Sequence, residues 1–254
     1  MKSLVRLRQR RERDRTGRFL VEGFRELTRA ADSTVEVETL FVCPDLYLGE
    51  GEGRLVDRLA VSGVEVVEVA ETPFRKASYR DRPEGLLAVA RQFPTSLSAL
   101  DLSGPALALV AESIEKPGNL GTMLRTADAA ACTGVVVADP ATDPFNPNVV
   151  RASLGTLFSV PLAVATTGEA VEHLRSSGVR ILVASPDAEL PHYLADLTGP
   201  VALVVGSEQY GLSDAWLASA DERITIPMPG SVDSLNAAMA AGILLFEALR
   251  QRAG

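Results

Sequence analysis

Beyond about residue 105 the chain repeats one pattern, in which short, uniformly apolar runs alternate with stretches of helical or loop character. The apolar runs cover residues 106–111, 134–138, 160–165, 180–185, 201–205 and 223–226. A strand that is apolar along its whole length is buried on both faces, as in a parallel sheet with helices on either side. The pattern therefore predicts a Rossmann-like α/β domain built on a parallel sheet.

The first part of the chain carries a second, shorter α/β pattern. Helical spacing occurs at 22–31 and 54–61, and strand-like patterns occur at 35–42, 64–69 and 85–90. Together they predict a small α/β sandwich. The run 93–104 is rich in Pro, Ser and Gly, which indicates a connection. The predicted domains are therefore 1–93 and 105–254, joined by a linker over 94–104.

Composition narrows the class of protein. A chain of 254 residues suits one large or two small domains. It has no apolar run of about 18 residues, as a membrane helix needs, and its basic N-terminus lacks the apolar stretch of a secretory signal. Cys43 and Cys132 lie far apart, which argues against a disulfide framework and for a cytoplasmic location. His173 and His192 lack metal-ligand spacing, so no metal site is predicted.

Charge is unevenly distributed along the sequence. Residues 1–18, which we call the basic arm, carry a net charge of +6, so a net charge of −8 for the whole chain leaves −14 for the remainder. A basic segment on an acidic body is typical of an element that contacts nucleic-acid phosphates. The alternative is a solvated helix face, because Arg8–Glu12 and Arg10–Asp14 are spaced for ion pairs. The candidate phosphate contacts are Arg8, Arg10, Arg11 and Arg18.

Three loops that follow predicted strands combine Gly with small polar residues. They are 115–125, 205–213 and 226–236, and the last leads into a helix. Because ligands of open parallel sheets bind beyond the carboxyl ends of the strands, we expect such loops to converge. In the third loop, Gly230 is expected to adopt backbone conformations closed to other residues, and Ser231, Asp233 and Ser234 are candidate helix caps.

Two common nucleotide-binding motifs are absent from the sequence. No G-x-G-x-x-G follows the first strand of the predicted parallel sheet, and no G-x-x-x-x-G-K-[ST] occurs. The Gly-rich stretch 49–53 lies in a predicted loop, and its carboxylates would repel phosphate. A dinucleotide-binding enzyme and a P-loop nucleotidase are therefore disfavoured.

The loops carry a family pattern. It consists of Asn119-x-Gly121-x-x-x-Arg125, Gly206-x-Glu208-x-x-Gly211, Ile226-Pro-Met-x-Gly and Ser234-Leu-Asn236. In this order the motifs resemble those of the SpoU (TrmH-type) RNA 2'-O-ribose methyltransferases, in the SPOUT superfamily, from about Leu107 onward. In the first part, the stretches 19–23 and 83–89 resemble the L30e/L7Ae-type domain often fused to these enzymes, which implies a role in holding structured RNA.

The resemblance implies a fold and a set of partners. It implies a deep trefoil knot near the C-terminus, a homodimer formed through the second domain, and S-adenosylmethionine as the cofactor. The run 146–155 also matches the family, which implies that Arg151 and Ser153 lie on the RNA face. The residues implied to hold the cofactor, largely through backbone groups, are Ala184, Ser185, Gly206, Ile226, Met228, Leu235 and Asn236.

The catalytic residues implied by the resemblance are Asn119, Arg125, Glu208, Ser234 and Asn236. A guanidinium keeps its proton under ordinary conditions, so we interpret Arg125 as a forked contact to the target phosphate instead of a simple base. The predicted reaction is 2'-O-methylation of RNA, with ribosomal RNA as the expected substrate. The alternatives are the same chemistry on transfer RNA, or a non-catalytic RNA-binding or assembly protein that retains the fold.

Overall fold

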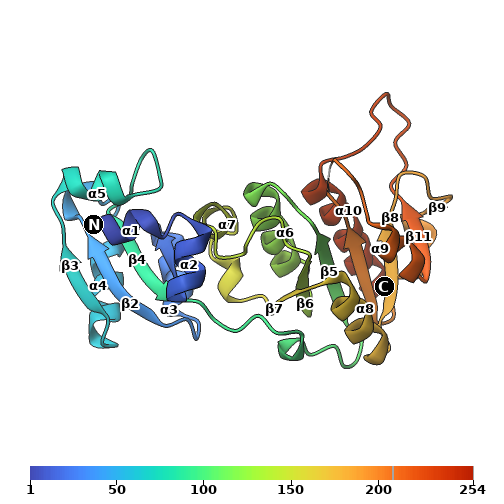
Figure 1. Cartoon of the computed structure of the whole chain (residues 1–254), viewed down its shortest axis with the longest axis horizontal. Helices are drawn as coiled ribbons and strands as arrows, with labels where there is room; N and C mark the ends of the chain where they lie inside the picture. Colours follow the sequence, from blue (N-terminus) through green and yellow to red (C-terminus); the bar gives the residue numbers. More distant parts are fainter. Residues whose placement is uncertain (208, 254) are drawn as a thin grey trace. The chain divides into compact units, whose positions relative to one another are not determined.

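A computed structural model describes residues 1–207 and 209–253, and the chain forms two compact units (Figure 1). Unit 1 contains Met1–Pro94 and Asp143–Ser159, and unit 2 contains Thr95–Thr142 and Val160–Gly254. The chain therefore passes from one unit to the other three times. The segment Asp143–Ser159, which lies inside the second predicted domain in the sequence, folds as part of unit 1.

Unit 1 is built on a four-stranded sheet. Its strands are β1 (Arg18–Glu22), β2 (Val37–Val42), β3 (Glu65–Glu68) and β4 (Leu86–Arg91), in the order β1-β4-β2-β3. The last three coincide with the predicted strand patterns. The sequence analysis missed β1, because only three apolar residues lie between Gly17 and Gly23, which both have positive φ.

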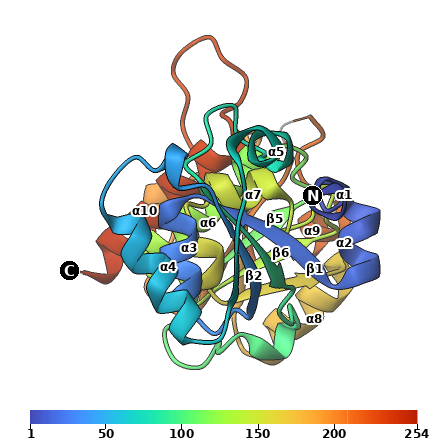
Figure 2. The ribbon, with the colours of Figure 1, turned by 90° about the vertical axis from the view of Figure 1, so that its left-hand side faces the viewer.

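Helices cover both faces of this sheet. They are α1 (Lys2–Arg6), α2 (Arg10–Thr16), α3 (Phe24–Ala31), α4 (Gly51–Val61) and α5 (Glu71–Ala77), with a 3-10 turn η1 (Pro44–Leu46). Leu4 and Leu7 from the basic arm pack with Phe74 of α5 against Leu20 and Leu87 of the sheet. Figure 2 shows α3 and α4 to the left of the strands and α1 and α2 to the right. The basic arm is therefore a packed part of unit 1.

The segment Asp143–Ser159 completes the core of unit 1. It contains α7 (Pro147–Ala152), which packs against β1, and the 3-10 turn η3 (Thr156–Phe158). The ring centroids of Phe145 and Phe158 lie 5.0 and 6.1 Å from that of the fully buried Phe19. At the start of the segment, Asp143 forms a buried ion pair with Arg13 of α2. Aromatic packing and this ion pair tie the segment to β1 and α2.

Unit 2 confirms the predicted parallel sheet. Its strands are β5 (Leu107–Glu112), β6 (Gly134–Ala138), β7 (Leu162–Ala165), β8 (Arg180–Ala184), β9 (Leu190–Pro191), β10 (Val201–Val205) and β11 (Glu222–Thr225). The order is β7-β6-β5-β10-β8-β11-β9, and the described strand pairs are all parallel. The sequence analysis missed only β9, which has two residues and so leaves no periodic signal.

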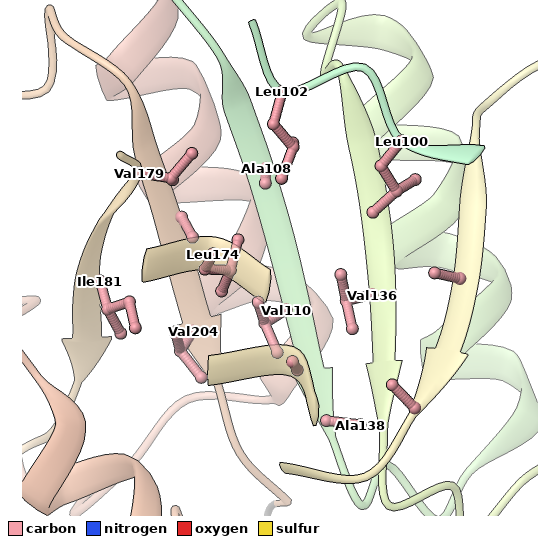
Figure 3. Packing of buried hydrophobic residues seen from close by; sticks show 14 of the residues in the cluster. Leu100, Leu102, Ala108, Val110, Val136, Ala138, Leu174, Val179, Ile181 and Val204 are labelled. Carbon is pink, nitrogen blue, oxygen red and sulfur yellow. The ribbon is translucent and has the colours of Figure 1, made fainter. Parts of the chain in front are cut away.

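Two helix pairs cover this sheet. α6 (Pro117–Ala129) packs against α10 (Ala237–Arg252), and α8 (Thr167–Ser176) packs against α9 (Asp214–Ser219); a 3-10 turn, η4 (His192–Leu194), follows β9. Leu174 of α8 is buried with Ala108, Val110 and Val204 in one core cluster (Figure 3), to which Trp216 of α9 also belongs. No helix of the described chain is long and apolar enough to span a membrane.

The predicted linker is mostly part of unit 2. The carbonyl of Thr95 accepts a hydrogen bond from the Val164 amide at 2.8 Å, and a 3-10 turn η2 (Leu97–Ala99) follows. Leu100 and Leu102 are buried in the core cluster of Figure 3. A Cβ on Gly134 would lie 2.8 Å from Leu100 Cδ2, so β6 leaves room for this leucine. The Pro, Ser and Gly content indicated a connection between domains. The segment instead packs on β6 and β7, because its leucines are buried in the core of unit 2.

Candidate active site

The predicted loops converge on a pocket in unit 2 at the carboxyl ends of β8, β10 and β11. Six of the seven predicted cofactor residues line it, namely Ala184, Ser185, Gly206, Ile226, Met228 and Leu235. The Ser185 amide donates to the Ile224 carbonyl at 3.0 Å, which joins the ends of β8 and β11. Asn236, the seventh, is absent from the lining and instead begins α10.

A tight turn after β10 forms one wall of the pocket. Ser207 and Gly211 exchange two backbone hydrogen bonds, at 3.1 and 2.9 Å, and Gly211 has φ +67. A Cβ on Gly206 would lie only 2.1 Å from the Gly211 carbonyl oxygen, so position 206 excludes every side chain. The motif Gly206-x-Glu208-x-x-Gly211 thus specifies a backbone shape, which we call the 206–211 turn. The predicted catalytic Glu208 lies outside the described residues.

The start of α10 forms the opposite wall. The Asn236 side-chain oxygen accepts hydrogen bonds from the amides of Ala238 and Met239, at 3.0 and 3.3 Å, and so caps the helix. Asn236 is therefore the cap, where the sequence suggested Ser231, Asp233 or Ser234. Gly230 does not have positive φ, so the conformational freedom expected of it is not used. Ser234 is exposed and lines the pocket.

A hydrogen bond joins the first and last motifs. Nδ2 of Asn236 donates to Oδ1 of Asn119 at 3.1 Å. Asn119 lies in the first turn of α6, which has Pro117 in its first turn and packs against α10. Gly242 of α10 faces Thr126 of α6, since a Cβ at 242 would make an ordinary contact of 3.7 Å with Thr126 Cγ2. Three of the predicted catalytic residues, Asn119, Ser234 and Asn236, thereby gather at one edge of the pocket.

Arg125 does not join them. Six residues along a helix turn the side-chain direction by about 600°, so Asn119 and Arg125 leave α6 roughly 120° apart. Arg125 is exposed and does not line the pocket.

The sequence analysis missed one buried carboxylate beside this site. Glu112, at the end of β5, is 4% exposed, and its Oε2 accepts a hydrogen bond from the Ser213 amide at 2.9 Å. Ser213 is the N-cap residue of α9 and follows the 206–211 turn. Glu112 therefore links the end of β5, which precedes Asn119 in the chain, to Ser213, which follows the 206–211 turn. The sequence signal that could have identified Glu112 is that this one acidic residue directly follows the apolar run 106–111.

The cations of the basic arm have varied surroundings within unit 1. Arg10 pairs with Asp14 at 3.6 Å, as the solvated-face alternative expected. Arg8 does not pair with Glu12; it donates to the Ala77 carbonyl at 3.0 Å at the end of α5 and lies 5.4 Å from the Tyr79 ring centroid. Arg18 pairs with Glu38 at 2.5 Å. Arg11 is exposed and takes part in no ion pair within the described residues.

The predicted RNA-facing residues of α7 also lie in unit 1. Arg151 is exposed and borders a small hollow with Tyr79 and Arg80. Ser153, in contrast, is fully buried, and its hydroxyl donates to the Val150 carbonyl at 2.8 Å. Ser153 therefore closes the end of α7 and cannot line an RNA face.

Comparison with known proteins identifies the family. A sequence model of the SpoU rRNA Methylase family matches residues 106–246, and one of the MRM3-like substrate binding domain matches residues 1–88. The chain belongs to the SpoU rRNA methylase family. A 23S rRNA (uridine(2479)-2'-O)-methyltransferase of Streptomyces viridochromogenes is 34% identical, over 97% of this chain and 87% of the relative. The 23S rRNA (guanosine(2553)-2'-O)-methyltransferase RlmP of Bacillus subtilis is 30% identical, over 97% and 94%.

Solved structures of this SpoU family match across both units. The SpoU methyltransferase AviRb from Streptomyces viridochromogenes, in complex with the cofactor AdoMet, aligns with a TM-score of 0.89 at 32% identity. The alignment covers 99% of this chain and 98% of AviRb. The fold of this SpoU protein is thus the SPOUT fold, with a parallel sheet in its methylase part.

The pocket of this SpoU protein suits S-adenosylmethionine. Its described lining contains apolar side chains, the hydroxyls of Ser185, Ser207, Thr225 and Ser234, and no charged side chain. Apolar walls with a few polar groups are typical of sites for small ligands that combine a flat aromatic part with hydrogen-bonding groups. The forced approach of Gly206 to Gly211 leaves backbone groups at the wall, where a cofactor is held without a charged fingerprint.

Proposed function

We propose that this protein methylates a ribose 2'-hydroxyl of ribosomal RNA, using S-adenosylmethionine. The observation that carries the proposal is the convergence of the 206–211 turn, the 226–235 loop and the start of α10 around one uncharged pocket. Relatives that span nearly the whole chain are 23S rRNA 2'-O-methyltransferases, which supports ribosomal RNA as the substrate class. Work on that substrate implies a location in the cytoplasm.

The cofactor contacts in this proposal come mainly from the chain backbone. Gly206, Ile226, Met228 and Leu235 line the pocket and would hold the cofactor through main-chain groups, and Ala184 and Ser185 line it at the end of β8. S-adenosylmethionine supplies a methyl group on a positively charged sulfur, so the leaving group is already activated. The remaining tasks of the protein are to align the ribose hydroxyl and to assist the loss of its proton.

The side chains at the pocket edge perform the alignment. Asn236 uses its oxygen to cap α10 and its amide nitrogen to hold Asn119. This arrangement fixes both asparagines relative to Ser234, whose exposed hydroxyl faces the incoming ribose. Arg125 grips the target phosphate with its planar guanidinium, because a forked donor fixes the orientation of the nucleotide as well as its charge.

The experiment is methyl transfer from tritium-labelled S-adenosylmethionine to an unmodified 23S rRNA transcript. Arg125→Ala is expected to lower transfer at least about 100-fold, as loss of a preorganised donor does. Arg125→Lys is also expected to be poor, since an ammonium lacks the fork. S-adenosylhomocysteine affinity should be unchanged in both variants.

The matched control is Arg175→Ala, another exposed arginine of unit 2, on α8. It should retain full activity. Full activity in Arg125→Lys would reduce the role of Arg125 to a point charge, and full activity in Arg125→Ala would remove it from the mechanism. Absence of transfer by the wild-type protein to both ribosomal and transfer RNA would contradict the proposed function.

Unit 1 is proposed to hold the RNA. Arg11 and Arg151 are the best-placed candidates, because both are exposed and neither takes part in an ion pair within the described residues. Arg8, Arg10 and Arg18 already engage groups of unit 1, so their RNA contacts would compete with these. Affinity for the transcript should fall steeply with salt, and Arg11→Ala should flatten that slope. An unchanged slope in both Arg11→Ala and Arg151→Ala would place the RNA contacts elsewhere.

The protein is proposed to form a homodimer through α10. Met239, Ile243 and Phe246 have helical i, i+4, i+7 spacing, and Met239 and Phe246 are 61% and 49% exposed. An exposed apolar stripe of this kind marks an interaction surface. Phe246→Glu should give monomers in sedimentation experiments. Val61→Glu, at an exposed position at the end of α4 in unit 1, should not. A wild-type monomer would refute this part of the proposal.

A further inference from the structure

Tyr210 is the most exposed aromatic side chain of the described chain, with 76% of its surface accessible. It lies on the 206–211 turn, whose residues Gly206, Ser207 and Gly211 line the cofactor pocket, while Tyr210 itself does not. The ring is therefore presented to solvent directly beside the pocket. Burial within this chain does not account for a large aromatic at this position.

Hydrogen bonds join Tyr210 to the described residues of the turn. Its amide donates to the Ser207 hydroxyl at 3.2 Å, and the turn is closed by the paired backbone hydrogen bonds of Ser207 and Gly211. Gly206 approaches the Gly211 carbonyl closely, since a Cβ at 206 would lie 2.1 Å from its oxygen. A ring on such a support loses little conformational freedom when it binds, because only its own two side-chain torsions remain to be ordered.

The charge around Tyr210 argues for a neutral partner surface. The described residues of 206–213 and 227–236, which include Gly206, Gly211 and Met228 of the pocket lining, contain no Lys or Arg, and Asp233 is acidic. These stretches offer no cation to RNA phosphates, so phosphate contacts come from residues outside them, such as the proposed contact of Arg125. The flat face of a nucleobase carries no net charge and stacks well on an aromatic ring.

We propose that Tyr210 is a platform on which an unpaired nucleobase of the substrate stacks, at or next to the methylated nucleotide. This inference rests on the proposed function. When a nucleotide leaves its helix so that its ribose enters the pocket, its base is unstacked and can be covered by a new aromatic face. The 206–211 turn places that face beside the pocket, so the same turn serves the cofactor with its backbone and the RNA with its one aromatic side chain.

The test compares Tyr210→Ala and Tyr210→Phe with the wild-type protein on an unmodified 23S rRNA transcript. Loss of one stacked base lowers affinity by roughly 5- to 150-fold, so Tyr210→Ala should raise the KM for RNA by about 10-fold or more. Tyr210→Phe should remain close to the wild type, because stacking needs the ring and not the hydroxyl. S-adenosylhomocysteine affinity should be the same in all three proteins.

A matched control and a second readout make the outcome decisive. Tyr193→Ala removes a half-exposed tyrosine from the same unit and should leave the KM for RNA unchanged. Once the modified nucleotide is mapped, short RNAs with an abasic residue at it or at its neighbours should include one that wild type and Tyr210→Ala bind equally.

Several results would overturn the inference while leaving the proposed function intact. They are an unchanged KM in Tyr210→Ala, an equal loss in Tyr210→Phe, and a parallel loss of S-adenosylhomocysteine affinity, which would make the ring a support of the cofactor. A change of oligomeric state in Tyr210→Ala would assign the ring to an interface with a second copy. If the wild-type protein transfers no methyl group to RNA, the proposed function fails before Tyr210 is tested.

Discussion

At the scale of single residues, Gly206 shows how far motif and geometry agree. The motif singled out Gly206 for backbone contact with a cofactor, and the structure adds a reason, which is the approach of the Gly211 carbonyl. Gly230 shows the opposite case, because it also stands in a loop that follows a strand of the sheet, yet it has neither positive φ nor a close neighbour. Sequence alone could not separate these two glycines, since the difference depends on a contact five residues away.

The two glycines provide a matched pair of substitutions. Gly206→Ala would push a methyl group against the Gly211 carbonyl and distort the pocket wall, so unfolding free energy should fall by about 1–3 kcal/mol. S-adenosylhomocysteine affinity should fall as well. Gly230→Ala meets open space and should change neither quantity. Thermal unfolding with and without S-adenosylhomocysteine measures both, and a wild-type result for Gly206→Ala would show that the turn adapts.

At the scale of elements, the periodic apolar runs predicted the strands of unit 2 well, because a buried parallel strand leaves a continuous apolar signal. What holds the end of α10 was not predictable in this way. Gln251 donates to the Ala195 carbonyl at 3.0 Å and accepts from the Leu197 amide at 2.9 Å. Arg252 donates to the carbonyls of Leu197, Pro105, Ala106 and Gly199. These contacts join residues far apart in sequence and involve backbone carbonyls, which no sequence pattern records.

The stability contributed by the contacts of Glu247, near the end of α10, should depend on pH. Hydrogen bonds from Arg250 and then Gln251 lower the pKa of Glu247 to about 2. A carboxyl whose folded pKa is depressed stabilises the fold above its unfolded pKa of about 4.3, and this contribution disappears as the pH falls toward the folded value. Glu247→Gln should therefore be slightly less stable than the wild type at neutral pH, by less than about 1 kcal/mol, because the partner Arg250 is exposed to solvent.

The measurement is the difference in melting temperature between wild type and Glu247→Gln from pH 7 down to pH 3. The difference should shrink as the pH falls through this range. Glu172→Gln, on α8, is the control, because Glu172 forms no ion pair within the described residues. A constant difference at all pH values would show that the charge of Glu247 does not contribute.

At the scale of the whole molecule, the sequence predicted two α/β bodies but not how the chain is shared between them. Phe145 and Phe158 are apolar, and they satisfy a core equally well in either unit, so the pattern could not place them. The buried ion pair of Arg13 and Asp143 could not be predicted either, because it joins the basic arm to a residue 130 positions later. The trefoil knot that the family resemblance implies stays a prediction.

Domain-sized fragments should reveal the shared core. A fragment of residues 1–94 lacks the partners of Phe19 and Arg13, so it should melt at a lower temperature and less cooperatively than unit 1 does in the intact protein. Fusing residues 143–159 to it through a flexible linker should restore a cooperative transition. The same fusion with Phe145→Ser should not. Circular dichroism melts of the three proteins provide the comparison, and a cooperative, stable 1–94 fragment would contradict the expectation.

The passage of the chain between units also bears on how the protein is made. When residue 94 has left the ribosome, the four strands of the first sheet are present, but the residues that cover Phe19 have not yet been synthesised. The missing piece ends 65 residues later, at Ser159. At typical rates of 5–20 residues per second, the nascent first sheet waits roughly 3 to 13 s with an apolar face uncovered. Ribosome-bound chains arrested before and after residue 159 should therefore differ sharply in protease resistance.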